Sequence, residues 1–237
     1  SDVMSDDNKL QEIRARIDAL DEQIQSLIAE RAQCAEEVAA TKQTSESVYY
    51  YRPEREAEVL RKVIERNQGP ISNEDMERLF REIMSVCLAL QYPLKIAFLG
   101  PEGTFTQAAA LKHFGQSVNT LSLEGIEDVF REVESGAANY GVVPIENSTE
   151  GSVNHTLDMF LTSPLKIGGE IEMRIEQHLL GRMKGLDSIE RICAHEQSLA
   201  QCRGWLREYL PHVELIGVAS NATGARRARD EAGTAAI

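Results

Sequence analysis

The chain has 237 residues, enough for one large domain or two ordinary ones, and its 42% hydrophobic and 27% charged content is typical of a globular protein. A formal net charge of −13 speaks against a general nucleic-acid binder, because no basic surface is left over to neutralise phosphates. No apolar run approaches the roughly 18 to 20 residues that cross a bilayer, and the N-terminus lacks the basic and apolar regions of a signal peptide. These features predict a cytoplasmic protein that binds neither membranes nor nucleic acid.

A long helix is predicted over residues 8–42, which contain no proline or glycine. Its apolar residues recur at alternating steps of three and four and form a heptad seam. At 1.5 Å per residue the helix is a rod of roughly 50 Å, which a small domain cannot cover alone. We therefore expect an entwined homodimer. The seam consists of Leu10, Ile13, Ile17, Leu20, Ile24 and Leu27, with Val38 on its continuation.

Two further helices are predicted before residue 92. Pro53 suits the first turn of the second helix, and the segment 67–70 ends it, with a glycine available for a left-handed position. Ser72 and Asp75 resemble a capping box at the start of the third helix, which continues to Gln91. Residues 1–92 are therefore predicted to form an all-helical domain.

From Lys95 onward, short apolar runs alternate with helical patterns, which predicts an α/β domain over residues 93–237 with a mainly parallel sheet. A helix is expected from Thr106 to Phe114. The expected strands are Ile96–Leu99, Val118–Leu123, Tyr140–Ile145, Arg191–Ala194 and Val213–Val218.

Polar residues fall on the buried faces of the predicted helices. Arg31 occupies the seam itself, Arg14 and Lys42 lie beside it, Glu56 is on the apolar stripe of the second helix, and Gln91 is on the buried side of the third. Any one of them could extend to solvent or set the register of a dimer. Together they are harder to explain in that way, because unpaired buried charges cost several kcal/mol each. The surplus positive charge favours an anionic ligand, and two carboxylates would suit it.

The spacing of these residues resembles the all-helical chorismate mutase family over residues 8–92. The matching segments are 13–18, 29–31, Lys42, 53–56 and Gln91. The resemblance implies that Arg31, with Arg14 of a second chain, grips the carboxylates of chorismate. It also implies that Lys42 and Gln91 contact the ether oxygen, that Glu56 holds the ring hydroxyl and that Arg55 completes a cationic wall. Two substrate-contacting positions depart from the family pattern, with Cys87 in place of serine and Arg52 in place of an acidic residue.

Three segments of the second half end strands and begin helices: 100–106, 141–153 and 195–202. Each alone could be an ordinary helix cap. The first lacks the glycine and lysine spacing of a dinucleotide or P-loop site, which speaks against fusion to a nicotinamide-dependent prephenate dehydrogenase. Together they resemble prephenate dehydratase, with two lobes like a periplasmic binding protein and prephenate as substrate. The implied site residues are Glu146, Asn147, Ser148 and Gln201, with Thr104 and His195 as further candidates.

The dehydratase family's Thr-Arg-Phe motif and its phenylalanine-binding regulatory domain do not occur in these 237 residues. We therefore expect a working mutase and an inactive, incomplete dehydratase domain, in which the interrupted sheet leaves an unpaired strand edge. No cofactor or metal is expected. Cys193, His195 and Cys202 would allow a metal cluster, but the four cysteines are more simply reduced, buried thiols.

Two other functions compete with the enzyme. The first is a non-catalytic dimeric sensor, because two-lobed ligand-binding proteins share the strand–helix pattern and fold alone does not decide function. The second is a structural coiled-coil protein, which the α/β half disfavours. A plain dimerising helix pair has no use for Arg14, Arg31, Lys42 and Gln91 on one site. Turnover of chorismate therefore distinguishes the enzyme from both alternatives.

Overall fold

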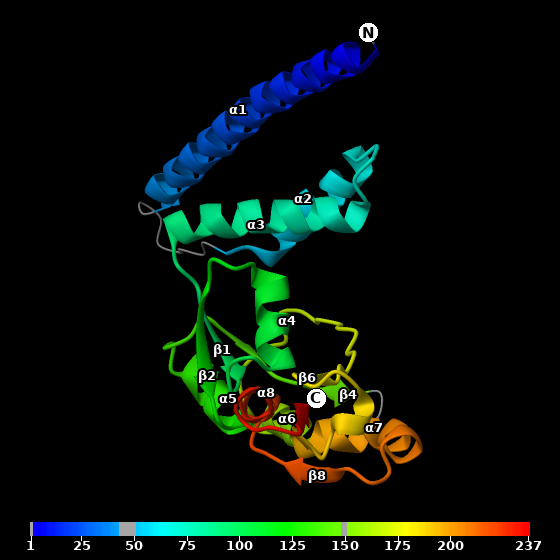
Figure 1. The fold of residues 1–237 in the computed structure, drawn as a ribbon. Helices are drawn as coiled ribbons and strands as arrows, with labels where there is room; N and C mark the ends of the chain where they lie inside the picture. The colour runs from blue at the N-terminus through cyan, green and yellow to red at the C-terminus, as the bar shows by residue number, and fades with distance from the viewer. Residues whose placement is uncertain (1, 43–50, 148–150) are drawn as a thin grey trace. The chain divides into compact units, whose positions relative to one another are not determined.

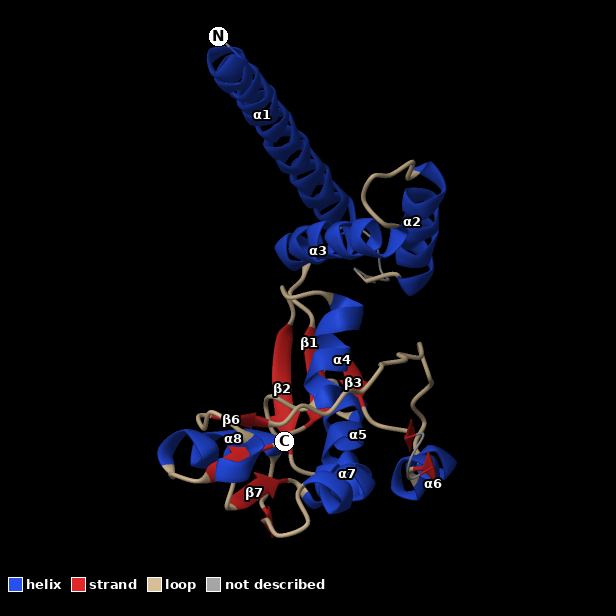
Figure 2. Cartoon of the chain, turned by 45° about the vertical axis from the view of Figure 1, so that its right-hand side comes forward, coloured by secondary structure: helices blue, strands red, loops and turns tan. Residues whose placement is uncertain are grey.

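The computed structural model describes residues 2–42, 51–147 and 151–237. The chain divides into two compact units. The helical unit comprises Ser1–Pro93 with Phe114–Val118, and the α/β unit comprises Leu94–His113 with Asn119–Ile237. The described strands all belong to the second unit (Figures 1 and 2). The two predicted fold classes are therefore confirmed.

The helical unit contains α1 (Asp2–Lys42), α2 (Pro53–Arg66) and α3 (Asn73–Gln91). As predicted, α2 begins at its proline, whose fixed backbone angle suits a first turn. The Ser72 hydroxyl caps α3: its oxygen accepts a hydrogen bond from the Asp75 amide at 3.1 Å and donates to the Asp75 carboxylate at 2.9 Å. Local sequence signals thus account for where these helices start.

The core of the helical unit is small and lies towards the C-terminal end of α1. Ala35 and Ala39 of α1 are buried, as are Leu60 and Val63 of α2 and Cys87 of α3. Figure 1 shows this end of α1 beside α3. The heptad seam is uncovered, with seven apolar residues that are 43–64% exposed: Leu10, Ile13, Ile17, Leu20, Ile24, Leu27 and Val38.

The segment Phe114–Val118 packs on α3 and so belongs to the helical unit. Gly115 has a φ of +80°, and a Cβ at this position would overlap the side chain of Ser85. The Gln116 amide donates to Glu82 Oε2 at 3.1 Å, and the Ser117 amide donates to the Ser85 hydroxyl at 3.3 Å. Only glycine combines this backbone conformation with so close an approach.

The first sheet of the α/β unit is parallel, with strand order β2-β1-β3. It consists of β1 (Lys95–Leu99), β2 (Asn119–Leu123) and β3 (Tyr140–Val142). The central strand is the most buried, since Ile96, Ala97 and Phe98 have no exposed surface. Helix α4 (Phe105–Phe114) follows β1, and α5 (Ile126–Glu134) packs against β1 and β3. This βαβ arrangement explains the continuous apolar run in β1.

Strand β3 is three residues shorter than the predicted strand, which ran to Ile145. Pro144 has no amide hydrogen for a sheet ladder, and its carbonyl oxygen instead accepts a 2.7 Å hydrogen bond from the Thr156 hydroxyl. A small antiparallel hairpin follows, formed by β4 (Glu146–Asn147) and β5 (Gly151–Ser152), and then α6 (Asn154–Thr162). Ser148 lies outside the described residues.

The second sheet has the order β6-β9-β7-β8, in which β6 (Leu180–Gly181) runs antiparallel to β9 and the other pairs are parallel. A short 3₁₀ helix, Leu186–Ser188, precedes β7. The sequence then alternates as predicted through β7 (Arg191–Ala194), α7 (Glu196–Tyr209), β8 (Glu214–Gly217), α8 (Asn221–Asp230) and β9 (Thr234–Ala236). Strand β9 is buried and paired on both sides, so the edges of this sheet are β6 and β8; the expectation that interruption of the domain leaves an unpaired edge stays a prediction.

All four cysteines are free thiols. Cys87 and Cys193 are buried and Cys202 is partly buried, but Cys34 is exposed, contrary to the prediction. It lies seven residues after Leu27, on the continuation of the uncovered seam, which explains its exposure. None of the described helices combines the length and apolar character that a membrane span requires.

Candidate active sites

An ion pair between α2 and α3 is the most buried among the described residues. Arg81 Nη1 donates to Glu56 Oε1 at 2.8 Å, and the two side chains are 22% and 16% exposed. Arg81 Nη2 also donates to Glu77 Oε1, one turn earlier on α3, at 3.2 Å. Burial raises the pKa of the Glu56 carboxyl, and the Arg81 guanidinium opposes that rise. The site therefore contains a partly desolvated carboxylate whose charged form is favoured by a neighbouring cation.

Two predicted cations lie on the face of α1 that α3 covers. Arg31 and Lys42 are partly buried. The series Arg31, Ala35, Ala39 and Lys42, in which both alanines are buried, advances by four, four and three residues. These steps place all four side chains on one helix face. Arg14 is exposed on the uncovered part of α1, roughly 25 Å from Arg31 along the helix axis at 1.5 Å per residue. A single chain therefore brings Arg31 and Lys42 to one face, and leaves Arg14 remote from them.

The predicted α3 residues lie near the end of that helix. Cys87 is buried, and Gln91 is partly buried with its side-chain oxygen, Oε1, fully enclosed. Among the residues that the structure describes, this oxygen has no hydrogen-bond partner. Buried amide oxygens are almost always satisfied in folded proteins, so an enclosed unpaired amide marks a place where a ligand or water completes the site.

The two predicted arginines at the start of α2 point to solvent and pair locally. Arg52 Nε lies 2.9 Å from Glu54 Oε1, and Arg55 Nη1 lies 2.8 Å from Glu58 Oε2, with both arginine side chains more than 60% exposed. Hydrogen bonds from Lys62 and Arg55 lower the pKa of Glu58 to about 2. In the single chain it is thus Arg81, and not Arg55, that accompanies Glu56.

In the α/β unit, the turn that follows β1 caps helix α4. The Thr104 hydroxyl donates to the Leu99 carbonyl oxygen and accepts from the Gln107 amide, each at 3.4 Å. The Gly103 amide in turn donates a 2.7 Å hydrogen bond to Gln107 Oε1. A Cβ at Gly103 would lie 3.8 Å from the Ala222 methyl group, which places this turn beside the start of α8.

The starts of α7 and α8 are tied together by one asparagine. Asn221 Oδ1 accepts from the His195 amide at 2.8 Å, and Asn221 Nδ2 donates to the Ser198 hydroxyl at 2.8 Å. The His195 ring caps α7, since its Nδ1 accepts from the Gln197 amide at 3.1 Å. Two helix N-termini and the turn before α4 therefore meet, which is an arrangement suited to an anionic ligand.

The remaining predicted residues lie in two places. Gln201 is one turn further along α7, where its Oε1 accepts from Gln177 Nε2 at 2.8 Å. Glu146 is exposed and Asn147 is partly buried in the β4–β5 hairpin. The structure thus brings Thr104 and His195 towards a common region through Ala222 and Asn221, and it holds Gln201 on the same helix as His195.

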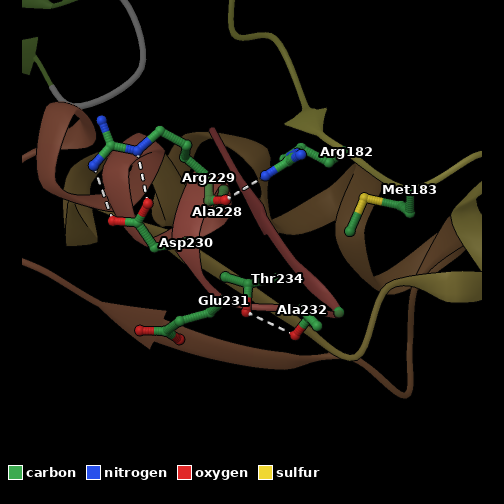
Figure 3. A pocket seen from close by; sticks show the side chains of 9 residues that line it. Arg182, Met183, Ala228, Arg229, Asp230, Glu231, Ala232 and Thr234 are labelled. Carbon is green, nitrogen blue, oxygen red and sulfur yellow. Dashed lines mark hydrogen bonds and ion pairs between the residues drawn. The ribbon is translucent and has the colours of Figure 1, made fainter.

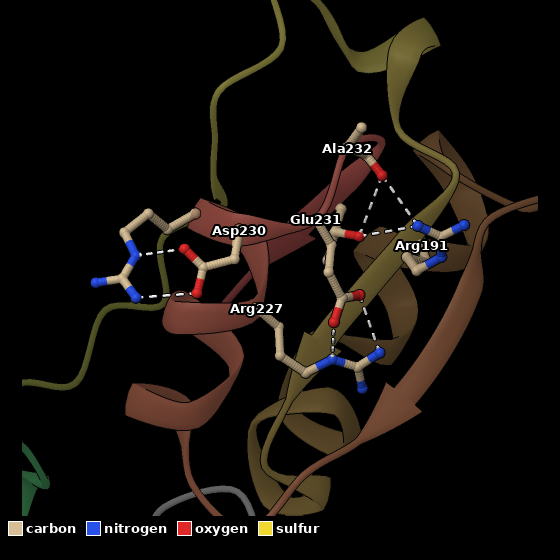
Figure 4. A network of polar contacts seen from close by, with 7 residues as sticks. Arg191, Arg227, Asp230, Glu231 and Ala232 are labelled. Atoms are coloured by element: carbon tan, nitrogen blue, oxygen red, sulfur yellow. Dashed lines mark hydrogen bonds and ion pairs between the residues drawn. The ribbon is translucent and has the colours of Figure 1, made fainter.

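A hollow of about 390 Å³ lies elsewhere in the second sheet, between β6 and the turn from α8 to β9. Figure 3 shows Arg182 reaching into it and donating to the Arg229 carbonyl oxygen. The neighbouring polar network in Figure 4 holds this turn: Arg191 binds the Ala232 carbonyl and the Thr234 hydroxyl. Arg227 binds Glu231 through two hydrogen bonds, which lower the pKa of Glu231. These contacts anchor β9, and none of the predicted site residues lines the hollow.

Comparison with known proteins gives two family matches. Residues 96–237 match the model of prephenate dehydratase, and residues 13–92 match that of chorismate mutase type II. The chain belongs to the prephenate dehydratase family. It is 57% identical over 239 residues to a protein of Stutzerimonas stutzeri named bifunctional chorismate mutase/prephenate dehydratase. That alignment covers 99% of this chain and 66% of the relative, so the chain spans just under two thirds of its length.

Two solved structures are similar to part of the chain. A prephenate dehydratase from Arthrobacter aurescens, in complex with L-Phe, is 33% identical with a TM-score of 0.47, and the match covers 61% of this chain and 49% of that one. A protein described as a quorum-quenching acylase, GqqA, is 26% identical with a TM-score of 0.50, over 60% of this chain and 52% of that one. The latter likeness supports the α/β fold.

Two residues of the candidate sites were not found from the sequence. Arg81 lies three residues before Met84 and seven before Leu88, and so falls on the apolar face of the third helix. A charged residue on an apolar helix face was the signal that identified Glu56, and it could have identified Arg81 as well. Asn221 follows a strand and the capping Ser220, and nothing local distinguishes it from an ordinary polar turn residue. Its role as a bridge to the dehydratase-family motif at His195 depends on a contact between residues 26 positions apart.

Proposed function

We propose that the protein carries out two successive reactions of phenylalanine biosynthesis. The helical unit would rearrange chorismate to prephenate, and the α/β unit would convert prephenate to phenylpyruvate. The family matches support both activities. The observation that supports the first is the cationic face of α1: Arg31 and Lys42 are partly buried on the part of α1 that packs against α3, the helix that ends in Gln91.

The mutase reaction is a pericyclic rearrangement that involves no nucleophile and no proton transfer. The protein has to hold a dicarboxylate in a compact conformation and stabilise the negative charge that develops on the ether oxygen. Arg31 is suited to the first task, because a guanidinium binds a carboxylate through two parallel hydrogen bonds. Lys42 and the Gln91 amide would donate to the ether oxygen, and Glu56 would accept from the ring hydroxyl.

A homodimer would complete this site. Arg14 and Arg31 are roughly 25 Å apart on one helix, so they can bind the same substrate only if Arg14 comes from a second chain. The uncovered seam of α1 supports such a pairing, because its apolar residues remain about half exposed in the single chain. A second copy is the natural occupant, since a heptad seam packs best against another heptad seam.

The dehydratase reaction breaks two bonds of prephenate and forms an aromatic ring. The ring carboxylate leaves as carbon dioxide, its bonding electrons enter the ring, and the ring hydroxyl leaves as water after accepting a proton. Glu146, Asn147, Ser148 and Gln201 are the proposed acid and polar contacts. Thr104 and His195 would shape the ends of the helices at which the carboxylates bind.

We also propose the boundary between the two activities at Tyr92–Pro93, because the two family matches lie on either side of it. The four free thiols are compatible with the cytoplasm, where disulfides are rare. No metal or cofactor enters either reaction as written.

The mutase proposal is tested by following the loss of chorismate with the wild-type chain, Arg31→Ala and Lys42→Ala. Each variant should lower turnover by roughly 10²- to 10³-fold, the usual effect of removing one group that stabilises developing charge. Arg16→Ala, an exposed arginine on the same helix, is the matched control and should be near wild type. A folded, dimeric wild type that leaves chorismate unchanged would contradict the proposal and favour a ligand sensor.

The dehydratase proposal is tested separately by detecting phenylpyruvate without acid treatment, since acid converts prephenate chemically. The expectation that this chain accumulates prephenate for lack of the Thr-Arg-Phe motif stays a prediction. Enzymatic phenylpyruvate, lost in Gln201→Ala, would show that the motif is dispensable. Phenylpyruvate formed equally by the variant and by a protein-free control would contradict a role for Gln201.

A further inference from the structure

We infer that Arg81 is a positioning residue of the mutase site, which holds Glu56 as an oriented, ionised hydrogen-bond acceptor for the substrate's ring hydroxyl. This inference rests on the proposed mutase function. None of the sequence motifs includes Arg81, and it is recognised only from its contact across the two helices. It touches Glu56 rather than the reacting atoms, so it would act through that carboxylate.

The burial of the pair distinguishes it from the other ion pairs of the helical unit. Arg81 and Glu56 are 22% and 16% exposed, whereas in the pairs that do not involve Arg81 each side chain is at least 38% exposed. Exposed pairs of that kind contribute little to stability. A half-enclosed carboxylate requires a partner, because desolvation penalises its charged form.

The geometry leaves one oxygen of Glu56 for a ligand. Arg81 Nη1 binds Oε1, and among the described residues Arg81 alone forms a hydrogen bond or ion pair with this carboxylate. Glu77 receives the other guanidinium nitrogen at 3.2 Å and so fixes the orientation of the fork. A planar guanidinium held at two points determines the direction of the carboxylate that it binds. Oε2 therefore remains available to accept a hydrogen bond from a hydroxyl group.

Arg81 affects both the ionisation of Glu56 and the orientation of its carboxylate. Burial raises the pKa of Glu56 and Arg81 opposes that rise, so removal of the guanidinium would raise the pKa further. Other charged groups on the three helices are Glu77 on α3, Arg52, Arg55 and Glu58 on α2, and Arg31 and Lys42 on the covered face of α1. Arg52 and Arg55 pair with Glu54 and Glu58, and among the described residues only Arg81 contributes an opposing charge to the Glu56 carboxyl. A protonated Glu56 would no longer be an anionic acceptor.

The test is a double-mutant cycle on chorismate turnover between pH 5.5 and 8.5, with Arg81→Gln, Glu56→Gln and the double variant. Arg81→Gln should lower kcat/KM about tenfold at neutral pH, with a further loss of up to about tenfold per pH unit below the raised pKa of Glu56. In the Glu56→Gln background the same substitution should have no further effect, because the group it acts through is gone. Arg81→Lys should retain the pH profile of the wild type.

Arg78→Gln is the matched control: it breaks an ion pair with Asp75 on the same helix, between side chains that are 72% and 54% exposed, and should leave the profile unchanged. Equal pH profiles of Arg81→Gln and wild type, or additive losses in the double variant, would overturn the positioning role. An inactive wild type would instead overturn the proposed function, and the substrate role of Arg81 with it. A ¹³C titration of the Glu56 carboxyl separates these cases, since its pKa should rise in Arg81→Gln whether or not chorismate is turned over.

Discussion

The two units bury their apolar residues in different ways. In the α/β unit, the central strands of both sheets are fully enclosed within the single chain: Ile96, Ala97 and Phe98 in one, and Ile192, Cys193 and Ala194 in the other. In the helical unit, seven apolar residues of α1 stay about half exposed. A sheet covered by its own crossover helices is complete within one chain, whereas a single long helix cannot cover its own seam. The comparison shows that the helical unit leaves an apolar seam uncovered, which the proposed homodimer would bury, whereas the α/β core is covered within one chain.

The largest expected effect comes from placing charges in the apolar seam of α1, which should affect the helical unit and not the α/β unit. Ile17→Asp combined with Ile24→Asp should convert the proposed dimer to a monomer and abolish the proposed chorismate turnover, because charges buried in a helix–helix interface cost several kcal/mol each. Light scattering measures the mass, and Glu22→Gln, which lies off the seam on the same helix, is the control. A monomeric variant with full turnover would show that one chain holds a complete site.

The converse change should weaken the α/β unit alone. Ile192→Ala removes a side chain with no exposed surface and should lower the free energy of unfolding by about 2–5 kcal/mol. Leu161→Ala removes the same class of side chain at 83% exposure and should change it by less than about 0.5 kcal/mol. Urea unfolding followed by Trp205, the single tryptophan, reports on this unit. Similar losses in the two variants would contradict the assigned core.

A third change tests the packing of the segment Phe114–Val118 on α3. Gly115→Ala and Gly136→Ala both place a side chain at a φ near +80°, which costs about 1–2 kcal/mol each. Gly115→Ala should lose about 1–3 kcal/mol more, because its new Cβ overlaps Ser85, whereas Gly136 has open space around it. Thermal unfolding of both variants measures the difference. Equal losses would show that the contact with Ser85 relaxes without cost.

The smallest effect concerns two glutamates on α2 that titrate in opposite directions. Lys62 and Arg55 lower the pKa of Glu58 to about 2, so its contribution to stability is present above its unfolded pKa and is lost as the pH falls from about 4.5 to about 2. Glu56 has a raised pKa, so its contribution favours the folded state at low pH and is lost as the pH rises through that pKa. The effect of Glu58 should be small, since its side chain is 38% exposed and its ion pairs are screened by solvent. Carboxyl ¹³C titrations, assigned with Glu56→Gln and Glu58→Gln, should give two midpoints on opposite sides of the ordinary value.

Element types were predictable wherever local signals were strong. Pro53, the Ser72 cap and the absence of breakers from residues 8–42 each have a direct effect on the backbone, and the three helices agree with the prediction. The strand at 191–194 was predicted with its observed limits. The prediction of strands failed where the apolar run was longer than the strand, or where the strands were very short. Strand β3 ends before Pro144, and the β4–β5 hairpin is only two residues on each side, too short for any periodic signal.

The amino-acid sequence by itself determined the two fold classes, the heptad seam and the set of charges on buried helix faces, because periodicity acts over neighbouring turns of one element. Only the tertiary structure decided which charges meet. No partner for Glu56 was predicted from the sequence, and in the structure Arg81 from α3 pairs with it, while Arg55 pairs with Glu58 one turn along α2. The pairing of β9 on both sides and the bridge from Asn221 to His195 likewise depend on contacts between distant segments. Such contacts follow from how whole elements pack, and the local pattern around each residue does not specify them.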